Sequence, residues 1–425
     1  MTKSNIFIEN VMYKILKPVS DDYFIRLQEA ENMTAQELYH KIMKSLNLNI
    51  IDGEEISEGT TIFPTPGCPH NVRNGEHCGC SFCDWNDTYI ANPAYVTVLR
   101  KKDHVLYKKM QLECFKLLRG VNKPAHIFEE YAIHDCFNDE QLSDDERDFL
   151  FEESNVFSVR PVIGLIQVRA ESISRSKIEK WRKMASKQLT LGIGVETGCE
   201  WLRNHWLNKK LSDSVLSNAV RIAHDCKCKV SANILMMLPG LNAKQSIELL
   251  IDSIIKMDDM GFDSIMLSPL VTKEYTIQNK LKNNVFNMDE CIYLIAKAMH
   301  ELSMLDKRYR NKIMFSSLNF MDYFTGSNFS DNCKQTIEAI KPLLVMGGMK
   351  DLRIEKILQF NYMEEYYQFS NRYENLDGLD SIKNTLKTCS QELADEVFSE
   401  KEKQEQIELF INELGNWNGA NYAKI

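Results

Sequence analysis

The amino-acid sequence predicts an α/β fold, a partial (β/α)6 TIM-like barrel with short N-terminal and mostly helical C-terminal extensions. Six apolar, β-branched runs alternate with amphipathic stretches over residues 59–306. Such alternation is typical of parallel strands joined by right-handed crossovers. It is also typical of an open, doubly wound sheet, so the pattern alone leaves both architectures open. We expect three regions: an N-terminal extension over residues 1–58, the core over 59–306, and a helical extension over 307–425.

Each of the six runs is predicted to be a strand because it is short, apolar and rich in β-branched residues. In chain order the runs are Thr60–Pro64, His126–Ile133, Val162–Val168, Leu189–Val195, Val230–Leu238 and Ser264–Leu270. Lys244–Met257 repeats apolar residues at the spacing of one helical face. Ser174 and Asp213 stand where two further helices are expected to begin.

Composition and charge argue against three classes of protein: strong nucleic-acid binders, membrane proteins and disulfide-rich secreted proteins. The chain has 425 residues and a formal net charge of −9, which argues against strong nucleic-acid binding. Residues 1–10 lack the apolar core of a signal peptide, and no apolar run reaches the ~20 residues that span a bilayer. We therefore expect a cytoplasmic protein without a membrane partner, in which the twelve cysteines do not form a disulfide framework.

Four of the cysteines, Cys68, Cys78, Cys80 and Cys83, crowd together after the first predicted strand. Three thiolates can hold three irons of a cubane cluster and leave the fourth iron open. Two sets of three iron ligands are possible: Cys68, Cys80 and Cys83, or Cys68, Cys78 and Cys83. Two histidines in the same loop make a structural zinc site the alternative interpretation. The position at the carboxyl end of a barrel strand, where active sites lie, favours iron–sulfur.

The cysteine loop and three later segments resemble those of radical S-adenosylmethionine (radical SAM) enzymes. The cysteine spacing is longer than the family's usual Cys-x3-Cys-x2-Cys. It is similar to the lengthened loops of the elongator-catalytic-subunit and biotin-synthase-like subgroups, where Cys-Pro opens the motif. The later segments are Leu191–Gly198 followed by Asn208–Lys210, then Asn233–Gly240, then Ser268–Leu270. By this resemblance, Cys68, Cys80 and Cys83 ligate a [4Fe–4S] cluster that binds S-adenosylmethionine, and Cys78 is extra.

The resemblance also implies cofactor contacts at the strand ends. The expected S-adenosylmethionine contacts are Gly194, Glu196, Thr197, Arg169, Glu171, Met236, Leu238 and Ser268. Arg169 and Glu171 could instead form a strand-end ion pair, although their position at the barrel mouth favours cofactor binding. Glu196 could pair with a basic residue at the barrel rim. The family's Gly-Gly-Glu after the second strand is replaced here by a segment with Glu129 and Glu130, which leaves the ligand of the methionyl amine unassigned.

Cys199 is a candidate hydrogen-atom donor, since it follows the glycine-rich segment of the fourth strand. A lone cysteine is more often a small buried apolar residue. Both interpretations stay open at this point.

The order of Val168–Ser172, Gly192–Thr197 and the Lys244–Met257 helix is similar to that in the radical SAM partner of archaeosine synthase. The resemblance implies that one electron from a flavodoxin- or ferredoxin-type donor cleaves S-adenosylmethionine, and that the 5′-deoxyadenosyl radical takes a hydrogen atom from the substrate. We expect a lyase-type reaction, C–N or C–C cleavage of a small amino-acid or modified-nucleobase substrate. Alternatives are radical modification of a ribosomally made peptide, with residues 1–58 binding its leader, and a non-enzymatic zinc or iron–sulfur module.

Overall fold

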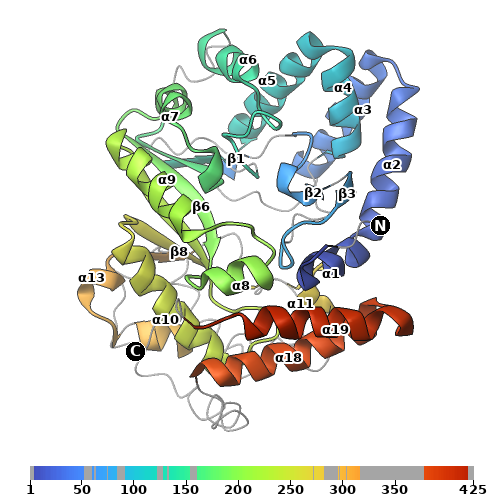
Figure 1. Ribbon diagram of the computed structural model, residues 1–425. Helices are drawn as coiled ribbons and strands as arrows, with labels where there is room; N and C mark the ends of the chain where they lie inside the picture. The colour runs from blue at the N-terminus through green and yellow to red at the C-terminus, as the bar shows by residue number, and fades with distance from the viewer. Residues whose placement is uncertain are drawn as a thin grey trace, which may run out of the picture.

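The computed structural model places a parallel sheet at the centre of the molecule, with helices around it (Figure 1). The described residues are 4–51, 60–61, 64–73, 75–83, 91–121, 128–131, 134–153, 160–270, 272–281, 295, 297–302, 304–315 and 378–419.

Seven parallel strands form the sheet, and they follow one another in chain order. They are β1 (Thr60–Thr61), β4 (Phe128–Tyr131), β5 (Ile163–Val168), β6 (Gln188–Glu196), β7 (Lys229–Leu235), β8 (Ser264–Ser268) and β9 (Ile313–Phe315). A doubly wound sheet reverses its strand order at a switch point. The consecutive strand order seen here is therefore that of a barrel and not of a doubly wound sheet. Among the described residues β9 does not pair with β1. The predicted partial barrel is therefore confirmed.

All six predicted strands are present, and β9 is a seventh that the sequence did not predict. Its three residues are too few to show a periodic pattern. It pairs with β8 (Ile265↔Ile313) and lies beyond residue 306. The sheet thus continues into the region predicted to be a helical extension.

Helices connect successive strands. They are α4 (Pro93–Lys102), α5 (His104–Val121), α6 (Asp144–Asp148) with η2 (Phe149–Glu153), η3 (Ala170–Ser172), α7 (Arg175–Trp181), η4 (Arg182–Met184), α8 (Glu200–His205), α9 (Asp213–Asp225), α10 (Ala243–Asp259), α11 (Ile277–Lys280) and α13 (Lys307–Arg310). Ser174 caps α7 as predicted, because its side chain accepts a hydrogen bond from the Lys177 amide. The cap of α9 is Ser212, one residue before the predicted start at Asp213.

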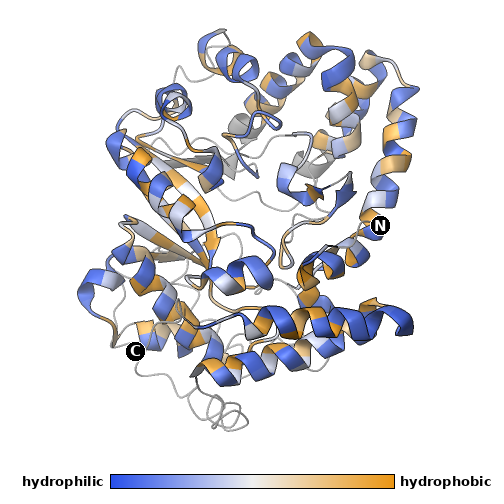
Figure 2. Cartoon of the chain, in the orientation of Figure 1, coloured by the Kyte–Doolittle hydropathy of each residue, from blue (hydrophilic) through white to orange (hydrophobic). Residues whose placement is uncertain are grey.

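The two faces of the sheet differ in polarity. In β6, Leu189, Leu191, Ile193 and Val195 are buried on the outer face, while the residues between them are polar or glycine. Figure 2 shows this strand as mostly apolar, with hydrophilic residues on the helix α9 in front of it. The outer face forms the main core with the helices, and the inner face stays available for a ligand.

Helices at both ends of the chain pack against each other. The N-terminal helices are α1 (Phe7–Ile15), α2 (Lys17–Glu31) and α3 (Ala35–Ile51), and the C-terminal ones are α18 (Gly378–Val397) and α19 (Glu400–Gly415). The Phe7 amide donates to Glu413 Oε1 of α19 at 2.7 Å, and Asn10 Nδ2 donates to Gln406 Oε1 at 2.9 Å. His205 of α8 lies 2.7 Å from the other Glu413 oxygen, so one carboxylate links both extensions to the barrel.

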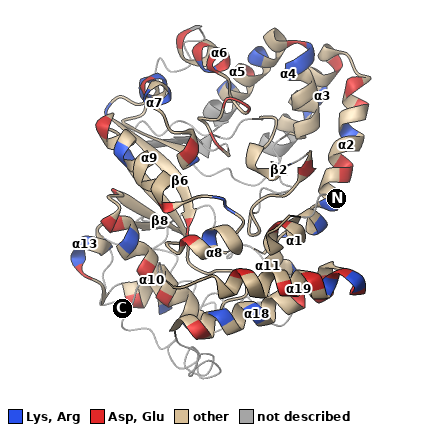
Figure 3. Ribbon diagram, viewed as in Figure 1, with Lys and Arg blue, Asp and Glu red and all other residues tan. Residues whose placement is uncertain are grey.

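Charges of both signs are interspersed along the helices drawn in colour in Figure 3. None of the helices in the described part of the chain combines the length and the hydrophobicity needed to cross a membrane.

Candidate functional site

The cysteine loop, residues 64–83, folds over the carboxyl ends of the strands. It contains a short helical turn, η1 (Pro69–Asn71), and a hairpin of β2 (Val72–Arg73) and β3 (Glu76–His77). After the hairpin, the Cys83 amide donates to the Cys80 carbonyl at 3.2 Å, which closes a tight turn between these two cysteines. The spacing Cys-x2-Cys therefore brings the two residues close in space.

A later loop, residues 206–210, clamps the cysteine loop. The Ser81 amide donates to the Leu207 carbonyl at 3.1 Å, and the Ser81 hydroxyl donates to the Trp206 carbonyl at 2.8 Å. Asn208, which is fully buried with φ 56°, donates from Nδ2 to the Gly79 carbonyl at 2.7 Å. Asparagine adopts this left-handed conformation more readily than other non-glycine residues. The Asn-Lys segment that follows the fourth predicted strand thus fixes the shape of the cysteine loop.

The clustered thiols divide into two environments. Burial raises the pKa of Cys68 to about 11, and the guanidinium of Arg169, close to both Cys68 and Cys80, opposes that rise. Cys78 instead faces α1, with its Sγ 3.5 Å from the Glu9 carbonyl oxygen. Burial also raises the pKa of Cys78 to about 11. The structure therefore brings Cys68 and Cys80 to one basic side chain and turns Cys78 elsewhere.

A buried ion pair lies beside the cysteines. Glu196 ends β6 with φ 68°, after a register shift that begins at Gly194. Its Oε1 lies 2.8 Å from Lys209 Nζ, and both side chains are about one-tenth exposed (10% and 12%). A Cβ on Gly194 would lie 2.6 Å from Lys209 Nζ, so glycine leaves the space that the pair occupies. Lys209 Nζ also lies 5.8 Å from the ring centre of Phe82, within the cysteine loop.

Arg169 belongs to the same group of charges. Its Nε lies 2.5 Å from Glu171 Oε1, and its Nη2 donates to the Lys209 carbonyl at 2.7 Å. Both ion pairs named above as alternatives to cofactor binding are present: Arg169 with Glu171, and Glu196 with the basic residue Lys209. Arg169 and Lys209 also lie within electrostatic range of Cys80, so both cations are placed to meet a negatively charged ligand there.

Asp135 is a site residue that the sequence interpretation missed. It is fully buried just after β4 and accepts hydrogen bonds from the Ser172 hydroxyl at 2.5 Å and the Phe137 amide at 3.1 Å. Burial raises the pKa of its carboxyl to about 6, and it lies within electrostatic range of Arg169 and Cys68. The sequence feature that could have revealed Asp135 is its position as an acidic residue just beyond the second predicted strand. The side chains of Glu129 and Glu130, considered for this place, lie outside the described residues.

Thr197 and Cys199 lie on the α10 side of the strand end. The Thr197 hydroxyl lies 3.5 Å from the Ser253 hydroxyl of α10 and accepts from the Cys199 amide at 3.3 Å. Cys199 stands at the start of α8, and burial raises its pKa to about 11. The predicted roles of both residues at the cofactor stay predictions.

The remaining predicted contacts lie at neighbouring strand ends. Met236 and Leu238 follow β7 and are buried. Ser268 ends β8, and its carbonyl accepts from the Met236 amide at 2.8 Å. These three residues form one rim of the barrel mouth.

The histidines of the cysteine loop have partners other than the thiols. His70 Nε2 lies 2.9 Å from the Asn208 carbonyl oxygen, and His77 Nδ1 lies 3.1 Å from the Ser20 hydroxyl. No three His, Cys, Asp or Glu side chains in the described residues converge on one metal ion. The ligands of a cubane lie farther apart, since each binds a different iron.

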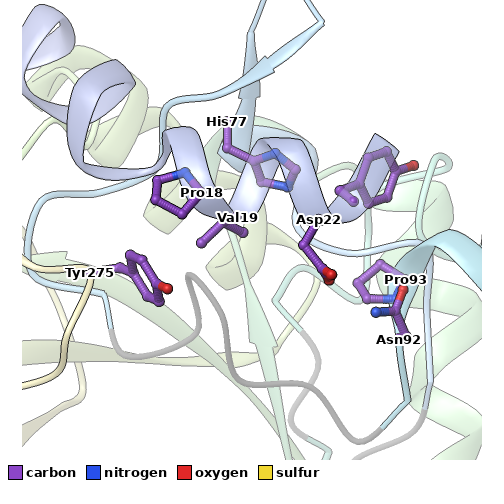
Figure 4. A pocket seen from close by; sticks show the side chains of 8 residues that line it. Pro18, Val19, Asp22, His77, Asn92, Pro93 and Tyr275 are labelled. Atoms are coloured by element: carbon purple, nitrogen blue, oxygen red, sulfur yellow. The ribbon is translucent and has the colours of Figure 1, made fainter. Parts of the chain in front are cut away.

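A cavity of about 230 Å³ lies between α2, the strand β3 of the hairpin and the start of α4 (Figure 4). Its lining comprises Pro18, Val19, Asp22 and Tyr23 of α2, His77 of β3, Asn92 and Pro93 at the start of α4, and Tyr275 after β8. The N-terminal extension, the cysteine loop and the barrel therefore all contribute to its wall. Its volume is somewhat below the ~300 Å³ at which small-molecule pockets begin.

No family model matches the chain. An uncharacterized protein of Methanocaldococcus jannaschii is 23% identical over 213 residues, which are 49% of this chain. The chain spans about half (54%) of the length of that curated relative.

Three solved structures show weak similarity. The radical S-adenosylmethionine methyltransferase TsrM from Kitasatospora setae, with cobalamin and a [4Fe–4S] cluster bound, is 12% identical with a TM-score of 0.32 (52% of this chain, 38% of that one). The archaeal Elp3 of Methanocaldococcus infernus is 15% identical with a TM-score of 0.39 (67% and 63%). Methylornithine synthase (PylB) is 14% identical with a TM-score of 0.36 (78% and 96%). At these scores, the functional interpretation rests on the cysteine loop and its surroundings.

Proposed function

We propose that the chain is a radical SAM enzyme in which Cys68, Cys80 and Cys83 hold a [4Fe–4S] cluster. The observation that carries the proposal is the division of the thiols, with Cys68 and Cys80 close to Arg169 and Cys78 turned toward α1. When bound, the cluster and S-adenosylmethionine, with one electron from a flavodoxin- or ferredoxin-type donor, supply a 5′-deoxyadenosyl radical that takes a hydrogen atom from the substrate.

The residues around the loop suit such a cofactor. Thiols must lose their protons to bind iron, and burial opposes ionisation of Cys68. Arg169 and Lys209, both in electrostatic contact with Cys80, would stabilise the negative charge of a thiolate-ligated cluster. The glycine at position 194 leaves room for the Glu196–Lys209 ion pair beside them.

We assign the binding of S-adenosylmethionine to charged groups of this chain. Arg169 is suited to its carboxylate, since a charge-assisted hydrogen bond from a guanidinium to a carboxylate is strong. Asp135 is suited to its amine, because it is a buried carboxylate within electrostatic range of both Arg169 and Cys68. Glu196 can accept hydrogen bonds from the ribose hydroxyls, with Lys209 holding its carboxylate in place. Cys199 remains a proposed hydrogen-atom donor.

The proposed reaction is a lyase-type C–N or C–C cleavage of a small amino-acid or modified-nucleobase substrate, as in the radical SAM partner of archaeosine synthase. The polar inner face of β6 supports a polar rather than a hydrocarbon substrate. A cytoplasmic location without a membrane partner belongs to the same proposal. The net charge of −9 argues against strong nucleic-acid binding.

Radical modification of a ribosomally made peptide is a second candidate. The cavity between α2 and the cysteine loop supports it, because residues of the N-terminal extension form half of that cavity's lining. In this alternative, a peptide side chain would occupy the cavity while the modified residue reached the cluster.

Anaerobic reconstitution tests the proposal. The protein should bind about four irons and form 5′-deoxyadenosine from S-adenosylmethionine in the presence of dithionite. Stoichiometric zinc without iron would favour the non-enzymatic module and contradict the proposal. A substitution in the cavity, Tyr23→Ala, separates the two candidate substrates: it should leave turnover of a small molecule unchanged and weaken turnover of a precursor peptide.

A further inference from the structure

The inner face of the barrel is polar at the depth just below the cofactor residues. Barrel interiors are ordinarily filled by branched apolar side chains. Here the strand pairing aligns Gln167, Gly192, Ser231 and Ser264 in one row across β5 to β8. The next row toward the carboxyl ends contains Gly194, Asn233, Met266 and Met314.

Space remains in front of these two rows. Gln167, Asn233, Met266 and Met314 keep part of their surface exposed, although they lie in the middle of the sheet. The residues of the same strands on the outer face, such as Ile193 and Ile234, are completely buried. The exposure is therefore confined to the inner face.

An amide pair crosses this face. Asn233 Nδ2 donates to Gln167 Oε1 at 2.8 Å, joining β7 to β5 across β6. The side chain of Gln167 passes directly over Gly192, where a Cβ would lie 2.8 Å from the same oxygen. Gly192 is needed for the pair to form, since any larger residue would displace the glutamine.

The pair leaves hydrogen-bonding capacity unused. Asn233 Oδ1 and Ser231 Oγ are buried atoms without a hydrogen-bond partner in the part of the chain that the structure describes. Ser231 is itself 0% exposed. Buried polar atoms nearly always have partners, so these two point to a ligand that supplies a donor.

The neighbouring side chains indicate the shape of that ligand. Met266 and Met314 lie in the same row as Asn233, and methionine sulfur makes favourable contacts with aromatic rings. The described side chains of both rows are uncharged. Lys209, which lies over Gly194, is neutralised by Glu196. A flat, uncharged ring that carries an N–H donor fits all of these groups.

We propose that Gln167, Ser231 and Asn233, with Met266 and Met314, form a subsite for a nucleobase-like heteroaromatic ring of the substrate. The proposal rests on the proposed function, because the ring would lie beneath S-adenosylmethionine. Asn233 pairs with Gly194, two residues before Glu196, which places the subsite about 7 Å deeper than the strand ends. It favours the modified-nucleobase substrate over a free amino acid.

The adenine of S-adenosylmethionine has the same chemistry, and the experiment separates the two sources. We would titrate hypoxanthine, a purine with N–H donors, and caffeine, a purine without them, into the wild type and Asn233→Leu. Leucine keeps the volume and removes the acceptor. Hypoxanthine should bind the wild type and bind the variant about tenfold more weakly, while caffeine should not bind above background.

S-adenosylmethionine affinity is measured on the same samples. It should change less than threefold in Asn233→Leu, whereas a loss of tenfold or more would assign the subsite to adenine and overturn the proposal. Equal hypoxanthine affinity in both proteins, or none in the wild type, would also overturn it. Ser231→Ala is a second variant, expected to weaken hypoxanthine several-fold, should Asn233→Leu fail to fold. Thr190→Val, one row deeper on β6, is the matched control and should bind hypoxanthine as the wild type does. Because the hypoxanthine and caffeine titrations need no cluster, they can succeed even if the iron test fails.

Discussion

The ion pair of Glu196 and Lys209 can be tested by replacing Glu196 with Gln. The two charges are 2.8 Å apart and about nine-tenths buried, and removing one partner of such a pair costs ~3–5 kcal/mol. Glutamine keeps an oxygen that can accept from Lys209 Nζ, so we expect the lower end, about 3 kcal/mol. Lys209 would be left beside Arg169, a like charge, which adds to the cost.

The assay is thermal unfolding of the wild type, Glu196→Gln, Lys209→Gln and the double variant, with S-adenosylmethionine affinity measured on each. The double variant contains no unpaired charge, so it should be more stable than the sum of the two single effects predicts, by about 2 kcal/mol of coupling. Affinity should fall roughly tenfold to a hundredfold in Glu196→Gln, as expected for one lost charge-assisted hydrogen bond.

Two results would refute this reasoning. A coupling below about 0.5 kcal/mol would mean that the pair contributes no more than an exposed one. Lower stability with unchanged affinity would restrict Glu196 to holding the strand end, without a role at the cofactor.

Three further predictions concern the cysteine loop and Asp135. Cys78→Ala should keep its iron and its S-adenosylmethionine cleavage, whereas Cys80→Ala should lose both; the reverse pattern in iron analysis would assign Cys78 as the ligand. Asp135→Asn should be more stable than the wild type at pH 7 by up to ~3 kcal/mol, because its raised pKa of about 6 makes ionisation costly in the folded state. Stability from this group is lost as pH rises from about 4 to 6, so unfolding curves of the two proteins should coincide below pH 4 and a constant difference would contradict the assignment. Asn208→Gly preserves the left-handed backbone but removes the bond to Gly79, so it should fold and bind less iron; full iron content would show that the clamp is dispensable.

The sequence was sufficient to predict six of the seven strands of the sheet, because strands buried on one face against helices need aliphatic residues at alternate positions. The pattern at Leu189–Val195 is an example, and β6 forms there. The order of the strands was not available from the pattern, since both architectures use the same units. Strand pairing, a long-range property, decided between them.

The sequence was sufficient to predict which types of residue form the candidate site. It was not sufficient to predict which of these side chains contact one another. Spacing alone could not tell whether Cys78 or Cys80 faces the barrel mouth, because that depends on the bonds that Asn208 makes to the loop. Lys209, the partner of Glu196, is thirteen residues later in the chain, beyond a helix. Tertiary packing, which the local sequence pattern does not show, brings the two side chains together. Asp135 was missed because it lies in the loop beyond the strand, and its hydrogen bond to Ser172, 37 residues later, is a tertiary contact.

The clamp on the cysteine loop also sets the order in which the protein can mature. The bonds from Ser81 to the Trp206 carbonyl and from Asn208 to Gly79 join segments that are 125 and 129 residues apart. During translation, the cysteines leave the ribosome well before the residues that shape their loop have been synthesised. Under the proposed function, iron would reach its final geometry only after the chain has folded through α8, and until then the thiols would be exposed to oxidation. Cluster loading would be a late, post-translational step, and a variant that slows barrel folding should accumulate as iron-free protein even when every ligand is intact.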